Sequence, residues 1–180
     1  MRDLSQLEDV EMAGMLFQSI ASACMNLRFV LGAEGVALLG DIEPHGWYPI
    51  RHYYRLVELV TAGYTDPGPI LEQIGMNISR NWYEGGGKAL ITRSVDFLAI
   101  QVAGHGYHSV VRGPKEKLGK VSILYLNEPE GRAIIHTTTL TPRALQRGVY
   151  LGAFQIVGDM TFVQVTTSPT DADVLEIEFH

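Results

Sequence analysis

The spacing of the apolar residues changes at Pro114, and this change constrains the fold more than any other feature of the chain. Before Pro114, apolar residues recur three and four positions apart, which predicts helices with one buried face. After it, alternating segments rich in β-forming residues flank turn sequences, which predicts two strand pairs on either side of one helix. The sequence therefore predicts an α+β fold, in which an N-terminal helical layer is followed by a β-β-α-β-β antiparallel sheet. The segments after Pro114 are 120–126, 132–140, 142–159, 160–167 and 173–179.

Capping residues, glycines and prolines divide the helical half into segments. Residues 7–32 are expected to form one or two helices, preceded by a capping box of Ser5 and Glu8. Residues 34–47, with several Gly and Pro, are expected to form a loop. Amphipathic helices are expected over residues 49–63 and 69–84.

Two histidines lie at the end of the next apolar pattern. Four apolar residues with helical spacing predict a buried helix face that continues to His105, with His108 about one turn further on. Gly104 and Gly106 flank His105, and each costs a helix about 1 kcal/mol relative to Ala. Either the helix ends here with solvated or hydrogen-bonded histidines, or the bare backbone leaves room for a bulky group. The four apolar residues are Ile91, Val95, Leu98 and Val102.

Composition excludes several classes of partner. The chain has 180 residues, 46% of them hydrophobic, which suits one globular domain. The net charge is −6 without a Lys/Arg cluster, so nucleic acid is not an expected partner. No apolar run approaches the length of a membrane span, about 20 residues, and the acidic N-terminus does not resemble a signal peptide. The single cysteine, Cys24, fits a core position and a cytoplasmic location.

Six short motifs follow one another in a recognisable order. Together they resemble the haem nitric-oxide/oxygen-binding (H-NOX) domains, within the superfamily that these share with 4-vinyl-reductase-like domains. The resemblance implies one ligand-binding domain over residues 12–180, preceded by an N-terminal extension over residues 1–11. The motifs are Gly46–Pro49, Tyr54–Glu58, Ile70–Gly75, Asp96–Leu98, Tyr107–Ser109 and Leu175–Phe179.

The resemblance implies a histidine that binds the iron of haem b. His108, between Tyr107 and Ser109, is preferred because the family has an aromatic residue and Thr around its ligand. An ungapped count from Phe97 selects His105 instead, so both remain candidates. A neutral imidazole suits ferrous iron, and one protein ligand would leave the sixth position open for a diatomic gas.

The sequence departs from the family where H-NOX domains bind the haem propionates with a Tyr-x-Ser-x-Arg motif. The matching stretch is Thr137–Thr141, which has neither the Tyr nor the Arg. Thr139 remains a candidate cofactor-binding residue. Buried carboxylates without cationic partners are costly, so haem would need another anchor. Arg143 and Arg147, at the start of the following helix, are candidates for this role and equally for a solvated helix face.

Three hypotheses follow. The chain is a haem-binding sensor of NO or a related gas, in which the helix over residues 12–23 covers the distal side and a separate signalling protein receives the response. Alternatively, it is a haem-free module for a small apolar ligand or for interaction. The third hypothesis is a divalent metal site built from His105 and His108, although no nearby side chains complete a tetrahedral set. Tyr150 is a candidate hydrogen-bond donor on the distal side of the haem.

No arrangement typical of an enzyme is present: the chain lacks a nucleophile elbow and paired carboxylates on one helix face. A homodimer formed through the helical layer is compatible with the sequence, which contains no heptad run that would require one.

Overall fold

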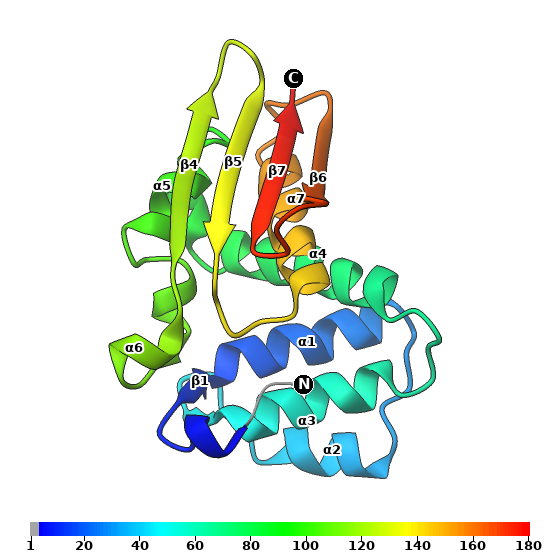
Figure 1. The fold of residues 1–180 in the computed structure, drawn as a ribbon. Helices are drawn as coiled ribbons and strands as arrows, with labels where there is room; N and C mark the ends of the chain where they lie inside the picture. The colour runs from blue at the N-terminus through cyan, green and yellow to red at the C-terminus, as the bar shows by residue number, and fades with distance from the viewer. Residues whose placement is uncertain (1–3) are drawn as a thin grey trace.

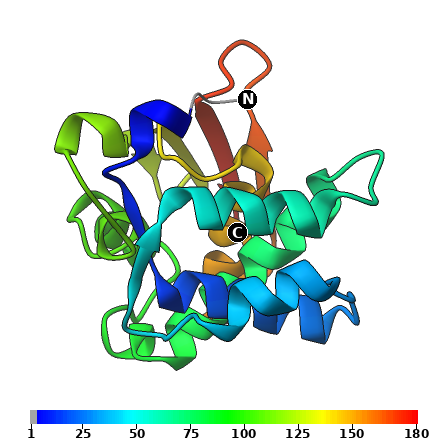
Figure 2. The same ribbon diagram turned by 90° about the horizontal axis from the view of Figure 1, so that it is seen from below.

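The computed structural model describes residues 4–180, which form a helical unit and a sheet unit (Figures 1 and 2). The first part of the chain contains η1 (Leu4–Leu7), β1 (Glu11–Ala13), α1 (Gly14–Asn26), α2 (Ala33–Gly40), β2 (Trp47–Pro49), α3 (Ile50–Thr61), α4 (Gly68–Glu84) and η2 (Gly87–Ala89). The second part contains α5 (Asp96–Val102), η3 (Tyr107–Ser109), β3 (Val111–Arg112), α6 (Lys115–Leu118), β4 (Val121–Asn127), β5 (Arg132–Thr137), α7 (Arg143–Ile156), β6 (Val163–Thr167) and β7 (Val174–Phe179).

The helical unit consists of α1, α2 and α3 with a short antiparallel sheet in the order β2-β1-β3. Figure 1 shows these helices gathered at the end of the molecule away from the C-terminus. The apolar face of α3 buries Tyr53, Leu56 and Val60 at the spacing of successive helical turns. Cys24 is buried in the same core, and burial raises the pKa of its thiol to about 11. It therefore behaves as a small apolar residue, as the sequence predicts.

The sheet unit is a four-stranded antiparallel sheet in the order β4-β5-β7-β6, covered on one face by α7 (Figure 1). The predicted β-β-α-β-β order is confirmed. Alternate residues of β5 and β7 point into the core, as period-two patterning requires, and α5 joins the same core through Phe97 and Leu98. The inward residues of the two strands are Ala133, Ile135, Leu175, Ile177 and Phe179.

Three glycines allow α4 and α7 to pack backbone against backbone. A methyl group added at Gly75 would overlap the carbonyl oxygen of Leu145, and one added at Gly148 would overlap that of Glu72. Gly152 faces the backbone of Met76 in the same way. Leu145 of α7 belongs to the core of the helical unit and Tyr150 to that of the sheet unit. This crossing therefore joins the two units.

Two predictions of secondary structure are wrong, one of a helix and one of a loop. Residues 11–13 are a strand and not part of a first helix, since Met12 pairs with Tyr48 and Val111. Residues 33–40 form α2 and not a loop, because Ala, Glu and Leu favour a helix and the breaking residues gather after it. The helices predicted over 49–63 and 69–84 are confirmed as α3 and α4.

The helix predicted over residues 91–105 is also shorter in the structure. It begins at Asp96 and ends at Val102, because Gly104 adopts a left-handed conformation (φ +84°) and His105 N–H donates to the Ile100 carbonyl. Ile91, Val95 and Leu98 are buried as expected, whereas Val102 is 49% exposed. His105 therefore does not continue the buried face.

The expected N-terminal extension lies partly against the helical unit. Leu7 and Val10 are buried in its core, while residues 1–3 lie outside the described residues. Among residues 4–180, no helix has both the length and the apolar character that crossing a membrane requires.

Candidate functional site

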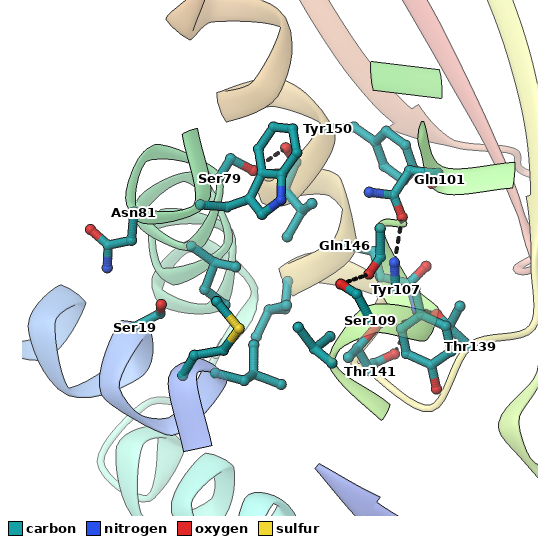
Figure 3. Close-up of a pocket in the computed structure, with 18 of the residues that line it drawn as sticks. Ser19, Ser79, Asn81, Gln101, Tyr107, Ser109, Thr139, Thr141, Gln146 and Tyr150 are labelled. Atoms are coloured by element: carbon teal, nitrogen blue, oxygen red, sulfur yellow. Dashed lines mark hydrogen bonds between the residues drawn. The ribbon is translucent and has the colours of Figure 1, made fainter. Parts of the chain in front are cut away.

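A cavity of about 430 Å³ lies between α1 on one side and α5 and α7 on the other (Figure 3). Helix α1 lines it with Met15, Ser19 and Ser22, and α4 adds Trp82. Strand β5, α7 and the segment 106–110 complete the wall. The cavity thus has walls from both units, and its volume falls in the usual range of small-molecule sites.

One wall carries a polar cluster whose groups satisfy one another. The Gln146 carboxamide donates to Thr139 Oγ1 (2.6 Å) and to the Thr141 carbonyl (2.8 Å). Its Oε1 accepts from Thr137 Oγ1 (2.9 Å) and from Arg143 (2.7 Å). Both hydrogens and both lone pairs of this amide are therefore used. The Thr-x-Thr-x-Thr stretch folds onto Gln146, and this cluster leaves no free amide donor for a ligand.

The α5–α7 side of the cavity also carries polar groups of a different kind. Gln101 of α5 is 8% exposed, and its Oε1 accepts from the backbone N–H of Tyr107 (3.1 Å). The Tyr107 hydroxyl donates to the Leu118 carbonyl (2.8 Å) and accepts from Leu140 N–H (3.0 Å). Tyr150 of α7 is 3% exposed and contacts Phe97 edge-on at a centroid distance of 5.8 Å. Burial raises the pKa of Tyr150, so its hydroxyl stays protonated.

Tyr107 and Thr139, two of the residues selected from the sequence, line the cavity. The two histidines are not among its lining residues in the described part of the chain. His105 is exposed; His108 is half-buried in η3 and contacts the Tyr107 ring edge-on at a centroid distance of 5.3 Å. Gly106 and Ser109 on either side of this pair do line the cavity, so the segment lies at its edge.

The two candidate arginines are engaged with acidic partners. Arg143 pairs with Asp173 of the loop before β7, in addition to its bond to Gln146. Arg147 pairs with Glu72 of α4 at 3.0 Å. Neither arginine lines the cavity within residues 4–180. Arg143 bonds to the lining residue Gln146, and Arg147 supports the crossing of α4 and α7.

The metal hypothesis requires a third ligand that the described residues do not bring together. No group of three or more His, Cys, Asp and Glu side chains suited to a metal ion occurs within residues 4–180. His105 and His108 are separated by the glycine-rich turn and do not share a helix face.

Sequence reasoning missed Gln101 and Gln146, two buried amides that line the cavity from α5 and α7. Gln101 lies three residues after Leu98, and this spacing was a usable signal, because a Gln beside an apolar helix face must find partners. Gln146 carries no comparable signal, because its partners come from β5 and the loop that follows it.

Comparison with solved structures identifies the fold. An H-NOX protein from S. oneidensis in the Fe(II)NO ligation state matches with a TM-score of 0.67 and 14% identity, over 94% of this chain and 99% of its own. An Fe(II) unliganded H-NOX protein from K. algicida matches with a TM-score of 0.62 and 11% identity, over 94% and 97% of the two chains. No protein-family model and no curated protein matches the sequence. The chain therefore has an H-NOX-like α+β fold, as its motifs predict. At these identities the likeness extends to the fold alone.

Proposed function

We propose that this chain is a sensor domain that binds an uncharged, mainly apolar small molecule in the cavity between α1, α5 and α7. The observation that carries this proposal is the chemistry of the wall. No Asp, Glu, Lys, Arg or His belongs to the cavity lining among residues 4–180, and apolar surface predominates in it. Burying a charged group there would leave it without a counter-ion, at a cost of several kcal/mol or more. A neutral ligand avoids that cost.

Haem, which the fold neighbours contain, is a poor match for this wall. A haem site needs an axial ligand, for which imidazole or thiolate is the usual choice, and cationic or hydrogen-bonding partners for two propionates. His108 and His105 lie outside the lining, and Arg143 and Arg147 are already paired with Asp173 and Glu72. The closed cluster around Gln146 occupies the stretch that matches the family's propionate motif. These observations favour the haem-free alternative.

A haem-based sensor of NO or a related gas remains the second candidate. The fold favours it, because the structures of similar fold are H-NOX proteins, one of them in an Fe(II)NO state. The position of His108 beside the cavity edge also favours it. In this proposal His108 is the axial ligand and His105 the reserve. No enzymatic reaction is proposed for either candidate.

The signal follows from where the cavity lies. Its walls come from the helical unit (Met15, Ser19) and from the sheet unit (Phe97, Tyr150). A ligand that contacts both units stabilises one relative position of them over another, which is a population shift. We propose that a separate signalling protein in the cytoplasm reads this shift, and that any homodimer forms through the helical layer.

Titration with Nile red, an uncharged dye whose emission rises in apolar surroundings, tests the proposal. Saturable, one-to-one binding is expected for the wild type, and Ser19→Phe should weaken it at least tenfold by filling the cavity from α1. Met25→Phe places the same side chain on the same helix at a position that is 78% exposed and outside the lining, so it should bind like the wild type. Equal binding by all three proteins, or none by the wild type, would contradict the proposal.

An ultraviolet–visible spectrum with added haemin, oxidised and reduced, tests the second candidate. A Soret band that shifts with NO and disappears in His108→Ala would establish haem sensing and overturn the haem-free proposal. Loss of the band in His105→Ala instead would move the ligand to His105. We expect neither histidine variant to differ from the wild type.

A further inference from the structure

The geometry points to a polar subsite at one end of the cavity, formed by Gln101 and Tyr150, that binds a neutral hydrogen-bond acceptor such as a ketone, ester or amide carbonyl. This inference rests on the proposed function, because it names the class of ligand that the same cavity takes. Figure 3 shows Gln101 and Tyr150 at the same end of the pocket, away from Ser19 and α1.

Gln101 has a donor left over after its structural contact is made. Its Oε1 is fixed by Tyr107 N–H at 3.1 Å, which determines the orientation of the amide and turns Nε2 away from that bond. Nε2 has no hydrogen-bond partner within residues 4–180, although the side chain is more than nine-tenths buried and lines the cavity. Two amide hydrogens therefore remain for a group inside the cavity.

Tyr150 offers a second unused donor. Its hydroxyl has no hydrogen-bond partner in the described part of the chain, and the residue is only 3% exposed. The Phe97 ring packs against the Tyr150 ring, and Phe97 lies one turn before Gln101 on the same face of α5. The two donors are therefore brought to one wall by the same contact between α5 and α7.

Donors without a protein partner are uncommon in residues as buried as these two, so their presence in one cavity requires an explanation. The Gln146 cluster shows that this fold can pair its buried amides completely where no ligand is needed. Gln101 and Tyr150 are not paired with each other. An acceptor on the ligand would satisfy both donors at once. A carboxylate would also accept, but no cation lines the cavity among residues 4–180. Arg143, whose charge acts on Tyr150, is paired with Asp173. A neutral carbonyl therefore fits best.

Acetophenone and α-methylstyrene test this inference, because they differ mainly in having C=O or C=CH₂ at the same position. The chain has two tryptophans, so the indole region of a ¹H–¹⁵N correlation spectrum contains two signals, and Trp82 lines the cavity. The shift of the Trp82 signal during titration gives the affinity for each compound. The quantity of interest is the ratio of the two dissociation constants, alkene over ketone.

In Tyr150→Phe this ratio should fall roughly fivefold, the usual effect of one hydrogen bond. Gln101→Glu at pH 9 should lower it at least as much, because an ionised Glu keeps the acceptor for Tyr107 N–H and has no donor. Tyr53→Phe is the control: its hydroxyl is buried and has no hydrogen-bond partner among residues 4–180, but Tyr53 is not part of the lining, so the ratio should stay unchanged.

The outcomes separate this inference from the proposed function. If both compounds move the Trp82 signal and the ratio is the same in all four proteins, the cavity binds small molecules but the subsite is refuted. If neither compound moves the signal, both the subsite and the proposed function fail. A ratio that falls in Tyr53→Phe as well would also refute the subsite, because it would show a general effect of removing a buried hydroxyl.

Discussion

The two sides of the junction between the helical and sheet units are built in opposite ways. On one side, α4 and α7 cross so closely that glycines replace side chains at the contact. On the other side, α1 and α5 stand apart and the cavity of about 430 Å³ lies between them. The same pair of units is therefore fixed at one edge and open at the other. This arrangement suits a domain whose ligand changes the spacing of the units about a rigid joint.

The two sides also differ in the kind of contact that holds their helices. The α4–α7 crossing depends on backbone contact, whereas α5 is anchored at its start by polar groups: Ser94 N–H donates to Asp159 (3.0 Å), and Ser94 Oγ to the Phe154 carbonyl (2.7 Å). Helix α5 has only seven residues and ends at a glycine turn. Short elements at the edge of a core open more easily than its packed centre, so the open edge is where we expect motion.

The largest effect is expected at the crossing. Gly148→Ala should lower the free energy of unfolding by about 3 kcal/mol, because the new methyl group would overlap a backbone carbonyl of α4 that cannot move alone. Urea denaturation measures this change. Gly40→Ala is the control, since nothing lies within 4 Å of that position at the end of α2; it should be neutral or slightly stabilising. A tolerated Gly148→Ala would show that the joint is not rigid.

The closed polar cluster should give the next largest effect. Gln146→Leu removes one shared partner of Thr137, Thr139 and Arg143, and should cost about 2 kcal/mol through the loss of several buried hydrogen bonds at once. The control is Gln155→Leu on the same helix, which is exposed and should change stability by less than about 0.5 kcal/mol. Equal urea midpoints for the two variants would mean that the cluster is not needed for stability and is open to a ligand.

The sequence predicted most of the sheet unit and less of the helical unit. Alternation in β5 and β7 reports burial directly, because side chains of one strand alternate between core and solvent. The strand over residues 11–13 depends on partners 34 and more residues away, such as Trp47 and Val111, and no local pattern reveals them. The helix over 33–40 was not predicted because glycines such as Gly35 usually interrupt a helix. In the structure Gly35 lies inside α2 and packs against Leu31, just before the helix.

The site was predicted in outline only. Tyr107 and Thr139 were selected by resemblance and line the cavity, whereas His108 lies beside it. His105 does not lie on the predicted helix face, because Gly104 ends α5 earlier than the apolar spacing suggests. Whether a side chain reaches a cavity depends on such turns and on the facing element. Periodicity within one segment contains neither kind of information.

The cavity edge should tolerate substitutions that the crossing does not. Ser22→Leu on α1 should change the free energy of unfolding by less than about 0.5 kcal/mol, because the half-buried Ser22 faces open volume. The same variant should weaken Nile red binding at least tenfold. Urea denaturation and the dye titration together check this. A loss of stability comparable to that of Gly148→Ala would mean that the two edges are packed alike. It would contradict the view that one edge is closely packed and the other open.

The smallest effect is expected at Asp96, the first residue of α5, and it depends on pH. Burial acts to raise the pKa of Asp96, but hydrogen bonds from the Arg93 and Thr92 N–H groups, together with the Arg93 guanidinium, outweigh it and hold the pKa below its ordinary value. A lowered folded-state pKa means that the carboxylate stabilises the fold above the unfolded-state pKa, about 3.9. That contribution is lost as the pH falls through the folded-state value.

Asp96→Asn should therefore lower the free energy of unfolding by about 0.3 kcal/mol at pH 7, a size typical of a partly exposed ion pair. The difference from the wild type should shrink below about pH 4 as the wild-type carboxyl takes up its proton. Urea denaturation at pH 7, 5 and 3 measures it, with Glu84→Gln at the end of α4 as the control for the loss of one negative charge. A difference that stays constant down to pH 3 would show that Asp96 anchors α5 by shape and not by charge. The open edge would then be held by packing, like the closed one.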